Sequence, residues 1–447
     1  MDATKLKDIV TSAIGREQLE EFARELGAVK RQSKVHMMEL VTALILAART
    51  NAGGRQAEAM RVFRDHLGGA RIARSTYYER FNSGLVALMQ CLLDRALEAA
   101  RADPVRLPPS IAFVEDWLIQ DATTVKLHDA LVPTYPGAGD YAALKVHKLY
   151  SIGRENLIGY RVGPAREHDA AQFKVDASWR GKGVLVDLGY VSHAFIRDCD
   201  EHGVSFVIRL KEGWKASVKG VAVGELTPRK SKAPLDLAHA LSTMKLRSDD
   251  GVLDADIELP METGSFPVRL VMLQIKGKGI CTFLTNVPRD KAPATLIADL
   301  YRLRWNIEHD NRLNKSDWVL DEIDGEKPES VKVLVYASLL GSAIVNRIVH
   351  ADTVERLDTT EPARVGPLHV RLVALTLATS AQMLAVAIVE GDESDLAWTR
   401  IARGIDAGGR DPNWRRTPSV LDIMHGFNPG PAKKRQDSVN SPPRNKQ

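Results

Sequence analysis

Apolar residues spaced three and four positions apart dominate both ends of the chain and predict helices there. The first helical region runs from residue 1 to about residue 108, where Pro104, Pro108 and Pro109 break the pattern. Two further helical stretches cover residues 330–349 and 365–389. Between these regions short apolar runs typical of β-strands replace the helical pattern. The sequence therefore predicts an α/β protein with helices at both ends.

Two aspartates follow apolar, strand-like runs in the central region. The run at residues 111–120 leads into Asp121, and GKGVLVDLGY at residues 181–190 places Asp187 directly after its apolar part. A strand fixes such a side chain while the following loop leaves it accessible, which suits catalysis. A buried aspartate there also needs a partner or a cation. Taken singly, each is as readily explained as a cap of the next turn.

Residues 214–281 have short β segments joined by charged turns, and only LDLAHALSTM (residues 235–244) has helical periodicity. This region is interpreted as a β-rich insertion.

After it, residues 301–315 (YRLRWNIEHDNRLNK) form one amphipathic helical pattern. At about 100° per residue, Arg312 falls close beside one arc of about 60°. This arc holds four polar residues: Tyr301, Arg304, Glu308 and Lys315. A neighbouring arc holds the apolar Leu300, Leu303, Ile307 and Trp318.

This polar arc has two interpretations. One carboxylate among three cations and a phenol suits a metal bound beside a phosphate-rich ligand. An ordinary amphipathic helix with i,i+4 and i,i+3 salt bridges has the same pattern.

Composition limits the choice of function. The 447 residues are 44% hydrophobic, which predicts a globular protein with a sizeable core. The net charge of +4 lies entirely in residues 428–447, a polar basic tail expected to be disordered. Nucleic-acid binding would thus need local basic patches.

The three cysteines are far apart and form no zinc or disulfide motif. No secretory signal is recognised, and the apolar stretch at residues 372–389 contains polar interruptions, which favours a buried or subunit-facing helix.

Residues 55–83 form the most basic part of the N-terminal region. Two helical patterns lie around Gly68-Gly69, and Thr76 with Glu79 has the spacing of a capping box. Six arginines fall in this stretch: Arg55, Arg61, Arg64, Arg71, Arg74 and Arg80. A helix-turn-helix-like DNA reader and a helical bundle with a solvated basic face explain it equally well.

Asp121, Asp187 and Glu308 together have the layout of an RNase H-like nucleotidyl-transfer centre, with two acids on adjacent strands and one on a helix packed against the sheet. Carboxylate oxygens are the ligands that Mg²⁺ and Mn²⁺ prefer. Two such ions, about 3.5–4 Å apart, can activate a water or 3′-hydroxyl and stabilise the leaving oxygen.

These residues resemble the DDE transposases of the IS4 family. The matching positions are Asp121 in QDATTVKL, Asp187 in LVDLGY, Thr285-Asn286 in FLTNVP, and Tyr301, Arg304, Glu308 and Lys315, which reproduce the signature Y-x(2)-R-x(3)-E-x(6)-K. The resemblance covers about residues 111–349. Two departures occur: D-L-G-Y lacks the basic residue often found after the second Asp, and His309-Asp310-Asn311 replaces the usual apolar or aromatic pair.

The resemblance implies roles for the matched residues. Asp121, Asp187 and Glu308 would bind two Mg²⁺ ions, with Mn²⁺ as a substitute, and Tyr301, Arg304 and Lys315 would contact DNA phosphates. Arg312 joins them only from helical geometry. Trp214 could stack on a flipped base, although packing at the end of its strand explains it more simply. Glu167-His168-Asp169 is interpreted as a set of solvated positions.

The predicted organisation follows from this resemblance. It comprises a helical DNA-binding region (1–108), an RNase H-like core in two parts (109–212 and 281–330), the β-rich insertion (213–280), a helical, dimerising C-terminal region (331–427) and the tail (428–447). The expected function is cut-and-paste transposition by a homodimer acting on terminal inverted repeats and target DNA, in a prokaryotic cytoplasm or nucleoid. Two alternatives are an RNase H-like nuclease without strand transfer and a catalytically silent DNA-binding repressor.

Overall fold

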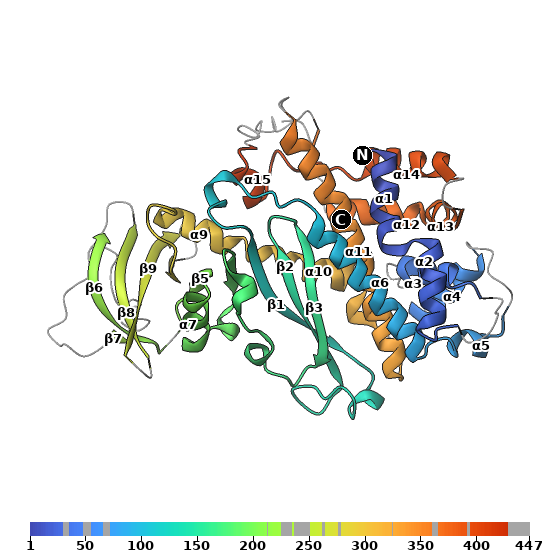
Figure 1. The fold of residues 1–447 in the computed structure, drawn as a ribbon, viewed down its shortest axis with the longest axis horizontal. Coiled ribbons are helices and arrows are strands. Elements are labelled where there is room, and N and C mark those ends of the chain that lie inside the picture. The colour runs from blue at the N-terminus through green and yellow to red at the C-terminus, as the bar shows by residue number, and fades with distance from the viewer. Residues whose placement is uncertain are drawn as a thin grey trace, which may run out of the picture.

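A single ten-stranded sheet runs through the described part of the molecule (Figure 1). The structure is a computed structural model and describes residues 1–29, 35–47, 55–65, 72–211, 213–224, 235–236, 251–261, 264–275, 279–323, 325–359, 365–390 and 394–427. The strands are β1 (Trp117–Lys126), β2 (Ala143–Ser151), β3 (Asn156–Pro164), β4 (Gly183–Val186), β5 (Ser205–Arg209), β6 (Lys215–Val223), β7 (Leu235–Asp236), β8 (Val252–Pro260), β9 (Ser265–Ile275) and β10 (Gly279–Thr285).

The first five strands lie in the order β3-β2-β1-β4-β5. β1 and β2 are antiparallel, as are β2 and β3, whereas β4 is parallel to both β1 and β5. This arrangement is the RNase H-like core that the sequence predicted. The first four residues of β1, Trp117–Gln120, are all buried, so both faces of the strand are covered there, as expected for the central strand of this five-stranded core.

The remaining strands extend the same sheet in the order β5-β10-β9-β8-β6-β7. The predicted β-rich insertion is therefore a continuation of the core sheet, and Figure 1 shows it at the opposite end of the molecule from the helices of residues 1–108. The helix predicted for residues 235–244 is wrong at its start, because Leu235–Asp236 pairs with β6 as a strand. The rest of that segment lies outside the described residues.

The described helices fall into two groups: most of those in the N- and C-terminal regions gather at the other end of the molecule, whereas those at residues 193–201, 294–302 and 305–316 lie against the sheet. They are α1 (Ala3–Ile14), α2 (Arg16–Glu25), α3 (Met37–Ala47), α4 (Arg55–Asp65), α5 (Arg74–Tyr78), α6 (Ser83–Ala102), α7 (His193–Glu201), α9 (Ala294–Arg302), α10 (Trp305–Ser316), α11 (Pro328–Asp358), α12 (Val370–Thr379), α13 (Ala381–Glu390), α14 (Asp395–Gly408) and α15 (Val420–Met424). Helices of the N-terminal and C-terminal regions share one hydrophobic core, in which α6 packs along α11 and α1 contacts α14.

The helix α11 is the centre of this shared core. It is the only single described helix with the length and apolar composition of a membrane span, and its most apolar 18-residue window is entirely buried inside the protein. The predicted helix at residues 372–389 is broken into α12 and α13, which bend by 78° and pass the same composition test only as a pair. The buried residues of α11 are covered by the chain itself, so a subunit contact would have to use other surfaces of residues 331–427.

The basic N-terminal stretch differs from its predicted form. Arg55 is 1% exposed and donates a hydrogen bond to the Leu334 carbonyl at 3.0 Å. Arg61 pairs with Glu58 of the same helix at 2.6 Å. The capping box at Thr76 is wrong, because α5 begins after Ala73. Gly68-Gly69 and Arg71 lie outside the described residues, so the helix-turn-helix interpretation stays a prediction.

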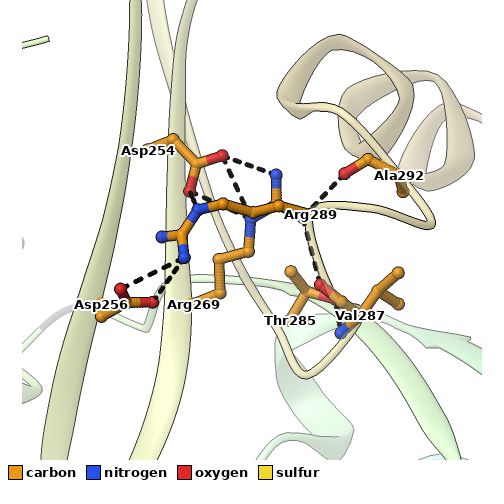
Figure 2. A network of polar contacts seen from close by, with 7 residues as sticks. All are labelled: Asp254, Asp256, Arg269, Thr285, Val287, Arg289 and Ala292. Atoms are coloured by element: carbon orange, nitrogen blue, oxygen red, sulfur yellow. Dashed lines mark hydrogen bonds and ion pairs between the residues drawn. The ribbon is translucent and has the colours of Figure 1, made fainter. Parts of the chain in front are cut away.

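A buried ionic network ties the insertion strands to the segment before α9 (Figure 2). The Arg269 guanidinium makes two hydrogen bonds through Nε and Nη2 to Asp254, at 3.0 and 2.6 Å, and Nη1 donates to the carbonyls of Val287 and Ala292. Arg289 reaches the same Asp254 at 2.9 Å. Because Arg269 and Asp254 are 6% and 4% exposed, their charges are removed from water and depend on these partners.

Replacing Arg269 with Ala should destabilise the protein by about 3–5 kcal/mol, because a buried Asp254 loses its bidentate partner. Urea unfolding monitored by circular dichroism measures this loss. The matched control is Lys219→Ala, whose pair with Glu258 at 2.9 Å is half exposed. That change should cost at most about 1 kcal/mol. Equal losses for the two variants would contradict the importance of the buried network.

Candidate functional site

Asp121 and Asp187 lie side by side at the carboxyl edge of the parallel strands. In the β1–β4 pairing Gln120 is opposite Val186, so Asp121 and Asp187 are the next residues along each strand. Asp121 continues β1 and is half-buried, whereas Asp187 immediately follows β4 and is exposed. Asp187 has no capping hydrogen bond to the short helix that follows it, so the capping alternative does not hold.

The predicted single helix at residues 301–315 is two helices. α9 ends at Arg302 and α10 begins at Trp305, and the tight connection is held by bonds such as Arg304 N to the Tyr301 carbonyl at 3.1 Å. Such i→i−3 hydrogen bonds tighten the backbone but need no particular residue type. The spacing of apolar and polar residues therefore does not reveal the break between the two helices. The predicted apolar arc is buried, with Leu300, Leu303 and Ile307 each 0% exposed. Trp318 is also buried, but it lies after the end of α10 and packs in the hydrophobic core shared by the N- and C-terminal helices.

Glu308 of α10 lies close enough to Asp121 to raise the pKa of that carboxyl, and it is paired with a cation of its own chain. Its Oε1 forms an ion pair with Nη2 of Arg304. The Arg304 guanidinium lies 5.5 Å from the centroids of the Tyr301 and Trp305 rings, and the residue is 8% exposed. Arg304 therefore faces Glu308 in this structure, where the sequence predicted a phosphate contact.

The three acids influence one another electrostatically. Burial raises the pKa of Asp121 to about 6, with the charges of Glu308 and Asp187 acting in the same direction and a hydrogen bond from the Ala122 backbone and the charge of Arg304 opposing it. Within the described residues, no three His, Cys, Asp or Glu side chains are close enough to hold one metal ion. Carboxylates repel one another when no cation lies between them, and here Glu308 is paired with Arg304.

The donor set nevertheless fits a divalent cation. All three side chains offer hard carboxylate oxygens, the Asp187 carboxylate is exposed, and Asp121 carries a raised pKa that a nearby cation would lower. Such a set matches Mg²⁺ or Mn²⁺ and lacks the sulfur and imidazole ligands that zinc sites use.

A cleft of about 580 Å³ opens beside Glu308. It is lined by Thr123, Glu308, Asn311, Arg312, Lys315, Ser316 and Asp321. Arg312 is exposed in it, and Lys315 Nζ lies 3.4 Å from Asp321. Tyr301 does not line this cleft: it is 6% exposed, and its ring packs 5.3 Å from that of Phe283. The structure thus places Glu308, Arg312 and Lys315 in the lining of one cleft. Tyr301 lies outside that lining and contacts Arg304 through its ring.

Two residues at the site were missed from the sequence. Asn311 donates a hydrogen bond from Nδ2 to Asp121 Oδ2 at 2.9 Å. Its position three residues after Glu308 on a helix was the available signal. Trp305 is 52% exposed beside Arg304, and its exposure cannot be read from residue spacing.

Other motifs have structural explanations. The Thr285 hydroxyl donates to the Phe206 carbonyl at 2.6 Å, and the Asn286 side chain bonds both the Phe206 amide and the Val204 carbonyl, which ties β10 to β5. Trp214 is half-buried and stacks on His193 with 4.6 Å between ring centroids.

Glu167-His168-Asp169 also has ordinary partners. Asp169 accepts from Lys145 at 2.7 Å, and Glu167 pairs with Arg161 at 3.2 Å. These ion pairs agree with the interpretation of this stretch as polar positions without a metal.

The strand order and the acids at its carboxyl edge define an RNase H-like protein. Residues 113–342, just over half of the chain, match the family described as Transposase DDE domain. The chain belongs to this family of DDE transposases and is an insertion-sequence transposase, which confirms the resemblance and the enzyme class predicted from the sequence. Members of the family bind DNA and depend on divalent metal ions.

Individual relatives support this assignment. The chain is 23% identical over 359 residues to the transposase for insertion sequence element IS231E of Bacillus thuringiensis subsp. finitimus, covering 72% of this chain and 75% of the relative. It is 35% identical over 75 residues to the putative transposase InsL for insertion sequence element IS186A of Escherichia coli (strain K12), covering 17% and 20%. A piggyBac transposase synaptic complex with hairpin DNA aligns with a TM-score of 0.49 and 8% identity over 95% of this chain and 92% of the other.

Replacing Asp121 with Asn should raise the melting temperature of the metal-free protein by about 2 °C at pH 8. The pKa of Asp121 is raised to about 6, so its ionised form costs stability above that pH. Below the ordinary aspartate pKa of 3.8 the carboxyl is mostly protonated in both the folded and the unfolded state, so most of the gain should be lost. Thermal melts in EDTA at pH 8 and near pH 3.5 measure it.

The matched control is Asp187→Asn, whose side chain is exposed and should leave the melting temperature unchanged. A melting temperature for Asp121→Asn equal to wild type at pH 8 would contradict the electrostatic cost at this site.

Proposed function

We propose that this transposase excises and inserts its own element by cut-and-paste transposition at terminal inverted repeats. Asp121, Asp187 and Glu308 are proposed to hold two Mg²⁺ ions, for which Mn²⁺ can substitute. One observation carries this proposal: two acids at neighbouring parallel strand ends and a third on α10 share one electrostatic site, in which burial and the other two acids raise the pKa of Asp121.

The bound ions would polarise the scissile phosphate and activate a water or 3′-hydroxyl. The protein side chains prepare that site. Strand β1 and the Asn311 amide fix the Asp121 carboxylate, and Asp187 presents an exposed carboxylate from the next strand. Glu308 must exchange its Arg304 partner for a cation, and the freed guanidinium is then available for a phosphate oxygen.

The DNA backbone is proposed to enter the cleft beside Glu308. Arg312 and Lys315 line that cleft and supply positive charge where Asp321 is the only acid besides Glu308 among its lining residues. Arg304 would add a further positive charge once it is released from Glu308. Tyr301 would position the Arg304 guanidinium, which lies 5.5 Å from its ring centroid. These contacts would position the duplex without reading its sequence.

The remaining regions are proposed to bind DNA and a second subunit. Residues 1–108 would contact the element's ends, and residues 331–427 would form the homodimer that pairs two ends before target insertion. Exposed apolar side chains in the second region support a contact there: Leu375 on α12, Val386 on α13 and Leu396 on α14. The site of action would be a prokaryotic cytoplasm, in association with the nucleoid.

Cleavage at the element's boundary should require both the metal and Glu308. The purified protein is incubated with the DNA that flanks its own gene, with Mg²⁺, Mn²⁺ or EDTA, beside Glu308→Gln. We expect cleaved and joined products only with metal and only for an intact Glu308, with loss of activity of at least about 1,000-fold in the variant. The matched control, Glu326→Gln, changes an acid 72% exposed near His128 and should stay active.

Three other results would each revise the proposal. Cutting without joined products would favour a nuclease, and binding without cutting in both proteins would favour a silent repressor. Full activity of Glu308→Gln would remove Glu308 from the site.

Replacing Lys315 with Ala should weaken binding to DNA of any sequence and reduce the slope of log affinity against log salt by about 0.9, because one phosphate contact is lost. Fluorescence anisotropy between low and moderate salt measures the slope. Arg302→Ala is the matched control, since Arg302 is exposed on α9 and pairs with Asp299 outside the cleft. A Lys315→Ala slope equal to wild type would place the backbone elsewhere.

A further inference from the structure

Three of the five buried residues of α10 are polar, which is unusual for a helix between a sheet and another helix. Asp310, Asn311 and Asn314 are 6%, 8% and 1% exposed. Two of these residues belong to the segment in which the sequence departs from the family pattern. Buried polar groups of this kind persist only when they are satisfied by specific partners.

Asp310 is fully satisfied by an ion pair and two amides. Its Oδ2 lies 2.8 Å from Nζ of Lys148, a residue 0% exposed on β2, and 3.2 Å from Nδ2 of Asn314. Its Oδ1 accepts from Nδ2 of Asn346 on α11 at 3.2 Å. Lys148 is opposite Asp121 in the β1–β2 pairing. The ion pair therefore aligns α10 with the strand that carries the first acid.

Asn311 differs from these structural residues because it contacts an acid of the site. Its Nδ2 donates to Asp121 Oδ2 at 2.9 Å. An ionised carboxylate can only accept, so the amide nitrogen of Asn311, and not its amide oxygen, bonds Asp121. That Oδ1 is buried and has no hydrogen-bond partner among the described residues; Oδ1 of Asn314 is also unpaired, but Asn314 does not contact an acid of the site. Asn311 also lines the cleft that holds Glu308.

An unpaired buried carbonyl is costly, and its presence at a site calls for a partner absent from the protein alone. We propose that Asn311 is a positioning residue of the metal centre. Its amide nitrogen orients Asp121, and its amide oxygen provides a fourth hard oxygen on the cation's side of the site. This inference rests on the proposed function, which assigns Asp121 to the cation.

The experiment is calorimetric titration of Mn²⁺ into the metal-free full chain, with no DNA and no turnover. Asn311→Leu should weaken Mn²⁺ binding about tenfold or more, as loss of a partner of a metal ligand does. Asn314→Leu is the matched control: it removes a buried amide of the same helix one turn on, with bonds to Asp310 and Ser342 but none to Asp121. Its Mn²⁺ affinity should stay within about twofold of wild type.

Melting temperatures in EDTA separate a positioning role from a structural one. Both leucine variants should lose thermal stability, whereas only Asn311→Leu should lose affinity for Mn²⁺. If Asn311→Leu does not fold, Asn311→Ser keeps a small polar group and is expected to weaken binding in the same direction. Wild-type affinity in the folded Asn311 variant would overturn the inference.

A double variant tests which side of Asn311 faces the cation. Asp121→Asn combined with Asn311→Asp keeps the hydrogen bond and moves the carboxylate to position 311. We expect it to bind Mn²⁺ more tightly than Asp121→Asn alone. No recovery would overturn the placement of the amide oxygen. Unchanged Mn²⁺ binding in Asp121→Asn itself would instead reject the proposed metal site, so the two failures are distinguishable.

Discussion

The ion pair between Lys148 and Asp310 determines where the third acid lies. Both charges are almost fully removed from water, at 0% and 7% side-chain exposure, so each depends on the other and on the amides around them. The pair joins β2 to α10, and α11 joins the same network through Asn346. Glu308 lies two residues before Asp310 on a rigid helix. Its position near Asp121 therefore follows from a contact on the opposite face of the helix.

A balance of charge keeps the acids apart in the metal-free protein. Arg304 neutralises Glu308, Asn311 donates to Asp121, and Asp187 is left to the solvent. Each acid has a different environment, and burial raises the pKa of Asp121 to about 6. Because Arg304 is sandwiched near two aromatic rings, its release from Glu308 need not expose an unsupported guanidinium.

Much of this arrangement could be predicted from the sequence, and the remainder could not for physical reasons. Strand-like runs before Asp121 and Asp187, and the spacing of Tyr301, Arg304, Glu308 and Lys315, were local signals and were sufficient to recognise the family. The break at residues 303–304 was not predictable from periodicity, because both sides keep helical backbone angles. Apart from Asn314, the partners of Asp310 and Asn311 come from residues 36 to 190 positions away, and no local pattern encodes such pairs.

The core shared by the two ends of the chain has a consequence for synthesis. The apolar faces of α3 and α6 pack against α11, which the ribosome completes more than 200 residues after α6. Until then these faces lack the cover that α11 provides, so the N-terminal helices can complete their packing only when almost the whole chain has been made. A prematurely terminated chain would expose this surface and become a substrate for chaperones and proteases. Only a chain synthesised past α11 could therefore form the folded site.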